Sequence, residues 1–362
     1  MGIILEVDLD SGEIRKRKVP DEVYELVLAG KGLGAWYLNK YIPAGADPLG
    51  PENILGFTAG ALTGTGALMC GRWNVVTKSP LTGGWGDANC GGMFAPAIKQ
   101  CGYDAIFFKG ISKKPVYLYC DNKVAELRDA SAYWGMDATE AEQKLIDDNW
   151  DKKKPAVALI GTAGEKLSLI SGICNESGRI AARSGVGAVM GSKKLKAVVL
   201  AGSKPMPCAD RKAVNALSKD LGRKLKKSGL PGFVKGGVLG VGGAMLGMLP
   251  TTVAMDGMMS APLLKKWGTP MNTPMAITSG DGPIKNWAGT PKDAKKAVGV
   301  FNPDKILAIE EKKYHCYSCG LGCGGVLNIE VMSKGEYPET HKAEYETLES
   351  FGALLLNDDL AS

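Results

Sequence analysis

Three cysteines, Cys316, Cys319 and Cys323, form a C-x2-C-x3-C run inside the stretch HCYSCGLGC. Thiols clustered at this spacing bind a metal ion or an inorganic cluster, and such a group constrains the fold of the segment around it. A structural zinc ion and a cubane iron–sulfur cluster each take four protein ligands, so the run is one ligand short. The motif therefore predicts a metal centre that needs a further ligand.

The residues around this run favour iron and sulfur over zinc. His315 directly precedes Cys316 and is poorly placed to bind the same ion. The backbone can curl around a bulky group and turn N–H groups toward sulfides, because glycines stand at positions 320, 322, 324 and 325. We expect a 4Fe-4S cluster, with a zinc site or plain buried thiols as the alternatives. The other six cysteines are scattered singly, and we expect them to be inert buried thiols.

The composition indicates a folded protein without a polymeric nucleic-acid partner. The chain has 362 residues, enough for two domains, with 45% hydrophobic and 23% charged residues. Its net charge of +6 comes from 44 basic and 38 acidic residues, and no basic stripe alternates with aromatics as nucleic-acid binding requires. The first residues lack the pattern of a signal peptide, so we expect a reducing cytoplasm, where clustered cysteines bind metal.

One segment, residues 236–255, has no charged residue over twenty positions. Six glycines and Pro250 make it a poor membrane helix. We expect no membrane span, and we interpret the segment as small residues packed closely in the interior.

The pattern along the chain predicts an α+β protein with two domains. Residues 1–205 read as a sheet-rich domain, and residues 206–362 as the first part of a mainly α-helical, incomplete domain that carries the cysteine run. A helix is expected at 138–148, with Asp137 as its N-cap, and another after Asp210. Strands are expected where short apolar runs lie between turn residues, at 104–110, 115–121, 156–161, 167–174 and 196–203.

The final residues, 344–362, predict one amphipathic helix that is still in progress at Ser362. Its apolar face should need a partner and comprises Leu348, Leu354, Leu355 and Phe351. We therefore expect the rest of this domain to come from further C-terminal sequence or from a partner subunit.

Four glycine-rich loops combine bare backbone with polar side chains, at 30–35, 60–74, 83–92 and 182–191. None matches the dinucleotide fingerprint, because Gly185 to Gly191 is one residue too long. Taken singly, each loop could be a turn in a sheet-rich domain. Taken together with the cysteine run, and with Arg72, Asn89 and Arg179 beside them, the loops favour a redox cofactor that carries phosphates.

Long stretches of this sequence resemble the tungsten-containing aldehyde ferredoxin oxidoreductase family. The stretches that carry the resemblance are AGALTGTGA, GRWNVVTKSPLTGG, ANCGGMFAPAIKQCGYDAIFFKG, GRIAARSGVGAVMGSKKLKAV, CYSCGLGC and EYETLESFGALLLNDDLAS. The resemblance covers nearly the whole chain and is weakest from about 225 to 290. It implies a sheet domain under two pyranopterins that hold one tungsten, with a 4Fe-4S cluster close by.

The resemblance also implies roles for particular residues. Cys316, Cys319 and Cys323 match three cluster ligands, and the fourth is expected beyond Ser362. Glu346 matches a glutamate of the substrate pocket and is a candidate proton acceptor. Pterin binding is expected from Arg72, between cluster and pterin, from the first loop with Asn89 and Gly91, and from the second loop with Arg179, Ile180, Ala182 and Ser184. Ile180 replaces a smaller residue and is expected to contribute only backbone.

The function implied by the resemblance is oxidation of an aldehyde to a carboxylic acid, with electrons passed through the cluster to ferredoxin. The implied cofactors are a tungsten bis-pyranopterin, with molybdenum less favoured, a 4Fe-4S cluster and a magnesium ion as a candidate bridge between the pterins. Two alternatives stay open. One is a low-potential aromatic acyl-CoA reductase acting on a thioester, and the other is a non-catalytic electron-transfer or scaffold subunit. An oligomer is expected in each case.

Overall fold

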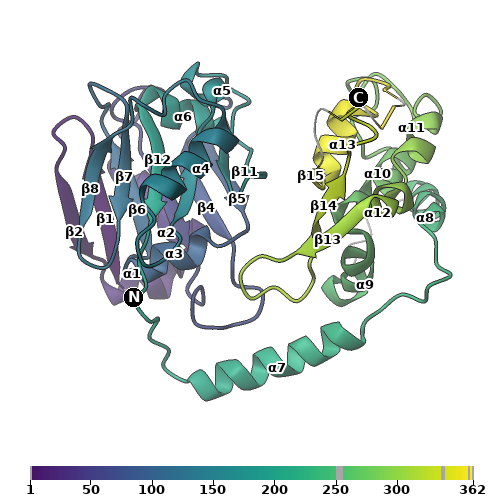
Figure 1. Ribbon diagram of the computed structural model, residues 1–362, viewed down its shortest axis with the longest axis horizontal. Helices are drawn as coiled ribbons and strands as arrows, with labels where there is room; N and C mark the ends of the chain where they lie inside the picture. Colours follow the sequence, from purple (N-terminus) through teal and green to yellow (C-terminus); the bar gives the residue numbers. More distant parts are fainter. Residues whose placement is uncertain (1, 250–255, 336–338, 358, 361–362) are drawn as a thin grey trace. The chain divides into compact units, whose positions relative to one another are not determined.

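The computed structural model describes residues 2–249, 256–335, 339–357 and 359–360 (Figure 1). The chain divides into two compact units. The first unit comprises Met1–Ser218 with Cys316–Ser318, and the second comprises Lys219–His315 with Cys319–Ser362. Within the described part of the chain, no helix is both long enough and apolar enough to cross a membrane.

The first unit contains two six-stranded sheets (Figure 1). The first sheet has the strand order β2-β1-β6-β3-β4-β5, in which β1 and β6 are parallel and the other neighbours are antiparallel. Its strands are β1 (Ile3–Asp8), β2 (Ile14–Lys18), β3 (Leu55–Ala59), β4 (Trp73–Lys78), β5 (Trp85–Cys90) and β6 (Ala105–Lys109).

The second sheet has the strand order β11-β10-β9-β12-β7-β8, in which β12 and β7 are the parallel pair. Its strands are β7 (Val116–Cys120), β8 (Ala125–Asp129), β9 (Ala156–Leu159), β10 (Ile173–Asn175), β11 (Arg179–Ala181) and β12 (Leu195–Leu200).

One core joins the two sheets, because buried residues of both sheets, such as Phe57 and Val198, belong to the same apolar cluster. Helices α3 (Phe94–Gln100) and α6 (Val186–Ser192) contact strands of both sheets and fill the space between them. The helices α1 (Asp21–Val27) and α2 (Lys31–Tyr41) cover the outer face of the first sheet, α4 (Ala138–Asp148) covers that of the second, and α5 (Thr162–Glu165) packs on α6. Burial of both faces explains why the inner strands β3, β6, β7 and β12 read as nearly continuous apolar runs.

Most of the local predictions for this unit are confirmed. Strands β6, β7, β9 and β12 lie in four of the five predicted stretches, whereas 167–174 is strand only from Ile173. Helix α4 begins after Asp137, whose carboxylate accepts a hydrogen bond from the Thr139 N–H at 2.8 Å. Helix α7 (Arg211–Lys227) follows Asp210, which accepts from the Ala213 N–H at 2.8 Å. The division between the units falls inside α7, whereas the sequence predicted it just before that helix.

The second unit is mainly helical and contains a small antiparallel sheet with the order β13-β14-β15. Its strands are β13 (Glu310–Tyr314), β14 (Gly324–Asn328) and β15 (Glu339–His341). Its helices are α8 (Gly237–Gly247), α9 (Gly257–Trp267), the 3-10 turn η1 (Thr269–Met271), α10 (Asn272–Ser279), α11 (Lys295–Val300), α12 (Pro303–Ala308) and α13 (Tyr345–Phe351).

Helix α8 occupies half of the uncharged segment 236–255, and residues 250–255 lie outside the described part. A Cβ added to Gly243 would lie 2.2 Å from Thr278 Oγ1 of α10, so the small residues allow the two helices to pack closely. The opposite face is exposed, with Val241 at 64% and Met245 at 62%. The expectation of a buried segment is therefore correct for one face of α8 only.

The long helix predicted at 344–362 is wrong beyond Phe351, where α13 ends. The helix stops because Gly352 has φ −96° and ψ −94°, and a Cβ there would lie 2.4 Å from the Leu348 carbonyl and from the Phe301 ring. Leu348 is 9% exposed, as expected for a core residue, but Phe351 and Leu355 are 62% and 61% exposed. Residues 358, 361 and 362 lie outside the described part.

Candidate functional site

The first group of expected pterin ligands lies on the neighbouring strands β4 and β5. Asn74 pairs with Asn89 in this ladder, and Arg72 directly precedes β4. The Arg72 Nε atom donates to Asn89 Oδ1 at 2.7 Å, and Nη2 donates to the Asn89 carbonyl at 3.3 Å. Both side chains are exposed. The structure therefore holds a guanidinium fork and a carboxamide together at the surface, where they can bind a phosphate or a pterin edge.

Gly91 is the point at which this loop meets the first cysteine of the run. A Cβ added to Gly91 would lie 2.4 Å from Cys316 Sγ and 3.2 Å from Arg179 Nη1. Its carbonyl is fixed by the Trp73 indole N–H at 3.1 Å and the Asn175 amide at 3.4 Å. Only glycine lets the thiol approach the backbone so closely.

The second expected pterin loop lies beside the first. Arg179 Nη1 donates to Cys316 Sγ at 3.2 Å, and Arg179 Nε contacts Glu176 Oε2 at 3.0 Å. Ser184, which has φ 62°, donates through Oγ to the Asp87 carbonyl at 3.2 Å. Two more expected ligands, Ile180 and Ala182, are exposed on this loop. The first unit thus gathers seven expected cofactor residues and Cys316 on neighbouring segments.

The cysteine run forms the connection between β13 and β14, because Tyr314 and Gly324 are the last pair of that ladder. Cys319 Sγ accepts from the Leu321 N–H at 3.4 Å, and Gly322 adopts φ +62° against the His315 ring. The described residues contain no group of three or more His, Cys, Asp or Glu side chains arranged to hold a metal ion. The structure therefore shows three half-exposed thiols on one short connection but does not assemble them around an ion.

This donor set can be compared with the expected cluster. All three candidate ligands are sulfur, which suits an iron–sulfur cluster, and Arg179 provides an N–H donor to one of these sulfurs. Gly91 leaves room beside Cys316 that a side chain would fill. These contacts fit a cluster, and they also agree with a zinc site, since zinc accepts thiolate ligands.

The catalytic candidate Glu346 lies in the first turn of α13, in the second unit, and is exposed. The next turn of the same helix carries Glu349, which is 6% exposed. Its Oε1 atom has no hydrogen-bond partner among the described residues. Burial, followed by the charges of Glu346 and Asp281, raises the pKa of Glu349 to about 7. This buried carboxyl was not expected from the sequence, because an amphipathic pattern does not show which polar residue is enclosed.

We predict that Glu349→Gln removes a pH dependence of stability. The unfolded chain ionises Glu349 near its ordinary pKa of 4.5, whereas the folded chain keeps the proton until about pH 7. Stability should therefore fall as pH rises through this window, by roughly 2 to 3 kcal/mol at about 1.4 kcal/mol per pKa unit. In urea unfolding at pH 5 and pH 8, Glu349→Gln should be more stable than the parent chain at pH 8 only.

The matched control for this experiment is Glu330→Gln, which changes an exposed carboxylate of the same unit that is not among the charges raising the pKa of Glu349. It should leave the pH profile of stability unchanged. If Glu349→Gln and the parent chain lose stability in parallel between pH 5 and pH 8, Glu349 is ionised in the folded chain and the prediction is wrong.

Two residues that organise the second loop were likewise not expected from the sequence. Glu176 forms an ion pair with Arg179 and accepts a hydrogen bond from the Met93 N–H, so it connects the two expected pterin loops. Glu142, buried on α4, accepts from the Glu176 N–H at 2.6 Å and the Ser177 N–H at 2.7 Å. The N-E-S-G stretch at 175–178 indicates a turn, and this turn is the sequence signal that could have identified Glu176.

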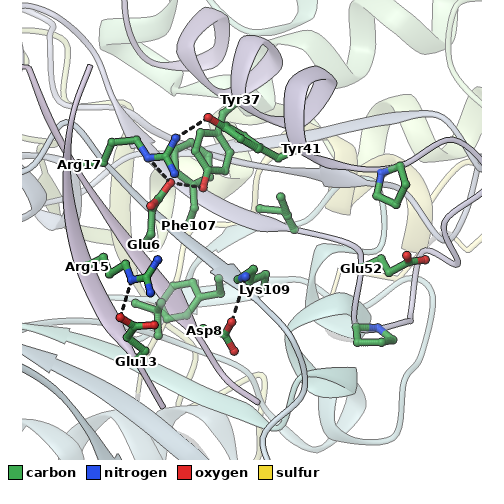
Figure 2. A pocket seen from close by; sticks show the side chains of 15 residues that line it. Glu6, Asp8, Glu13, Arg15, Arg17, Tyr37, Tyr41, Glu52, Phe107 and Lys109 are labelled. Carbon is green, nitrogen blue, oxygen red and sulfur yellow. Dashed lines mark hydrogen bonds and ion pairs between the residues drawn. The ribbon is translucent and has the colours of Figure 1, made fainter. Parts of the chain in front are cut away.

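A separate cavity of about 360 Å³ lies on β1, β2, β6 and α2, at the other end of the first sheet's strand order (Figure 2). Its three cations are each paired with a lining carboxylate, Arg17 with Glu6 at 2.8 Å, Lys109 with Asp8 at 3.0 Å, and Arg15 with Glu13 at 2.5 Å. None of the candidate site residues lines this cavity. Its charges hold the sheet edge together, and we do not assign the candidate site to it.

Two family models match the sequence of this chain. The model described as "Aldehyde ferredoxin oxidoreductase, N-terminal domain" matches residues 4–202. The model described as "Aldehyde ferredoxin oxidoreductase, domains 2 & 3" matches residues 251–362. The first match covers the segments that carry Arg72, Asn89 and Arg179, and the second covers the cysteine run and α13.

Individual relatives agree with these matches. The tungsten-containing aldehyde ferredoxin oxidoreductase of Pyrococcus furiosus is 36% identical over all of this chain and 54% of that protein. The corresponding protein of Thermococcus kodakarensis is 37% identical with the same coverage. The aliphatic sulfonate oxidoreductase WOR-like subunit of Pyrococcus furiosus is 33% identical over 93% of this chain and 50% of that protein. This chain thus spans about half the length of these relatives.

A solved structure gives the same result for the fold. A chain of the "Active site complex BamBC of Benzoyl Coenzyme A reductase in complex with 1,5 Dienoyl-CoA" matches with a TM-score of 0.73 and 28% identity. The match covers 98% of this chain and 52% of that chain.

Proposed function

The chain belongs to the aldehyde ferredoxin oxidoreductase family, and from this premise we propose that it forms the first part of a tungsten bis-pyranopterin enzyme. The proposed reaction converts an aldehyde and water to a carboxylic acid, two electrons and two protons. The electrons leave singly through a 4Fe-4S cluster to ferredoxin. The observation that carries this proposal is the convergence of Arg72, Asn89, Gly91 and Arg179 beside Cys316.

The residues of the first unit have distinct roles in holding the cofactors. Arg72 and Asn89 present donors and acceptors to a pterin edge, phosphate or bridging magnesium ion, and Arg179 neutralises charge beside the sulfur of Cys316. Cys316, Cys319 and Cys323 supply three cluster ligands. When bound, the tungsten centre supplies the two-electron oxidation and the cluster divides the electron pair.

In this proposal, two side chains of α13 take up and hold protons. Glu346, which is exposed in the first turn, takes a proton released from water or substrate. Glu349, one turn further on, holds a proton near neutral pH, because burial and the charges of Glu346 and Asp281 raise its pKa. Two carboxyl groups with different environments on one helix can divide the tasks of proton acceptor and proton store.

The proposed function predicts the metal content of the protein. Protein purified without oxygen from cells that are supplied with tungstate and that produce this chain together with the remaining part of the enzyme should contain both tungsten and iron and should oxidise aldehydes with a viologen dye. Arg72→Met should lower the tungsten and pterin content several-fold, because it removes the three hydrogen bonds to Asn89. Arg15→Met, at an exposed arginine on β2, is the control and should keep the full content.

The metal analysis also distinguishes the competing functions. Iron without tungsten would contradict the enzyme and support an electron-transfer subunit, and zinc alone would support a structural module. Unchanged pterin content in Arg72→Met would show that this residue has no part in cofactor binding.

A second candidate is reduction of an aromatic acyl-CoA thioester, which is favoured by the structural match to a benzoyl coenzyme A reductase complex. The same cofactors serve this reaction, with the electrons flowing in the opposite direction. Assays with an aldehyde and an oxidised dye, and with an aromatic thioester and a strong reductant, separate the two functions.

A further inference from the structure

The charge of this chain is concentrated on one helix. Helix α7 carries seven cationic side chains and one carboxylate, Asp220. Its net charge of +6 equals that of the whole chain, so all the other residues together are neutral. The cations are Arg211, Lys212, Lys219, Arg223, Lys224, Lys226 and Lys227, and all of them are exposed.

Five of these cations form one stripe, the basic face of α7. Lys212, Lys219, Arg223, Lys226 and Lys227 recur at the spacings that place side chains on one side of a helix. Among the described residues, the ion pairs of this helix are those of Asp220 with Lys224 at 2.9 Å and Arg223 at 3.4 Å. Most of the positive charge on this face is therefore not neutralised within the described chain.

The opposite face of α7 is attached to the segments around the cysteine run. In the first unit, Ser218 Oγ accepts from the Leu68 N–H at 3.1 Å, and the neighbouring Met69 N–H donates to the Ser318 carbonyl at 2.6 Å. In the second unit, Leu225 is 4% exposed, and a Cβ added to Gly320 would lie 3.2 Å from Leu225 Cδ1. The second half of the helix thus adjoins Gly320, between Cys319 and Cys323, and the first half contacts Leu68, whose neighbour Met69 bonds Ser318 between Cys316 and Cys319.

A solvated helix face would explain exposed lysines, but it does not explain why the entire excess charge lies beside the cysteine run. An electron carrier has to dock close to the cluster that reduces it, and complementary charge speeds and orients such encounters. We propose that the basic face of α7 is the docking surface for an acidic iron–sulfur electron carrier of the ferredoxin class. This inference rests on the proposed function, which requires a one-electron acceptor.

The experiment measures binding directly, so that it does not depend on catalysis. The parent chain and a Lys219→Glu/Arg223→Glu/Lys226→Glu variant are titrated with a purified acidic ferredoxin at several salt concentrations. The variant should bind at least about tenfold more weakly, and the Kd of the parent chain should rise with salt while that of the variant stays flatter. The milder Lys219→Gln/Arg223→Gln/Lys226→Gln variant should lie between the two.

The matched control reverses three exposed lysines outside α7, Lys18→Glu/Lys123→Glu/Lys166→Glu, with the same change in net charge. Its Kd for the ferredoxin should stay within about twofold of the parent value. Aldehyde oxidation with a small viologen dye should be equal in all variants, because the dye needs no docking surface. A parent chain without dye-linked activity would contradict the proposed function. The binding titration would still test the docking surface, because it does not depend on catalysis.

Several results would overturn the docking surface. One is equal affinity of the α7 variants and the parent chain, and another is an equal loss in the control variant. Absence of ferredoxin binding to the parent chain would also overturn it. Tighter binding of the parent chain to duplex DNA or to anionic vesicles than to the ferredoxin would assign the basic face to a different partner.

Discussion

Replacing Cys316, Cys319 or Cys323 with serine should remove the iron–sulfur cluster from this chain. Each substitution leaves two thiol ligands in the run, too few to retain a cubane that normally takes four. Bound iron should fall from about four atoms per chain to less than about one. The low-temperature EPR signal of the reduced protein should disappear, and inductively coupled plasma analysis should show the loss of iron.

The control for these variants is Cys208→Ser, which replaces a half-exposed thiol outside the run. It should keep both iron and signal. An EPR-silent parent chain that holds stoichiometric zinc would show that the three cysteines bind zinc. A Cys316→Ser chain with unchanged iron would show that the contacts of Cys316 with Arg179 and Gly91 do not belong to a cluster site.

Replacing Lys99 with methionine should destabilise the first unit by about 3 to 5 kcal/mol. Lys99 and Asp104 form an ion pair with side-chain exposures of 1% and 2%. Burial alone would raise the pKa of Asp104, but Lys99, Tyr24 and the Gly2 N–H together lower it. In Lys99→Met the carboxylate of Asp104 stays buried without its cation, and this unpaired charge lowers the free energy of unfolding. Urea unfolding followed by tryptophan fluorescence measures it.

Two further variants identify the cause of this loss. Lys99→Met/Asp104→Asn removes the stranded charge and keeps an amide that can accept from Tyr24 and Gly2, so it should recover much of the stability. Lys114→Met breaks an exposed pair with Asp129 and should have far less effect. Equal effects of Lys99→Met and Lys114→Met would show that burial does not determine the strength of these pairs.

The pH dependence of this pair has a definite sign. The pKa of Asp104 is lowered in the folded chain, so its contribution to stability is present above its ordinary pKa of 3.8 and is lost on acidification. The pKa of Glu349 is raised, so stability is lost in the opposite direction, as pH rises toward 7. Both carboxyl groups are buried. Lys99 lies beside Asp104 and stabilises its charged form, and this accounts for the opposite directions of the two pKa shifts.

The candidate site was predictable where one short segment carries the signal. The cysteine run, the loop with Asn89 and Gly91 and the loop with Arg179 and Ser184 are long enough to be recognised along the chain. Their mutual contacts were not predictable, because Arg179 and Cys316 are 137 positions apart and meet only through the folded sheets. Glu142 and Glu176, which fix the second loop, were missed for the same reason.

The sequence by itself determined the local structure and the family. Apolar runs between turn residues identified four strands of the first unit, and capping residues such as Asp137 and Asp210 identified α4 and α7. These features depend on hydrogen bonds and spacings within a few residues, which the chain itself specifies. The long motifs likewise lie in single segments, so the family was evident without a structure.

Only the tertiary structure decided which side chains are buried and which segments meet. The apolar pattern extended the last helix to residue 362, but close packing of Gly352 on Phe301 ends α13 at Phe351. Burial of Glu349 and of the Lys99–Asp104 pair, and the attachment of α7 beside the cysteine run, depend on segments distant in sequence. Desolvation and contact are properties of the assembled neighbourhood, and local sequence patterns do not contain them.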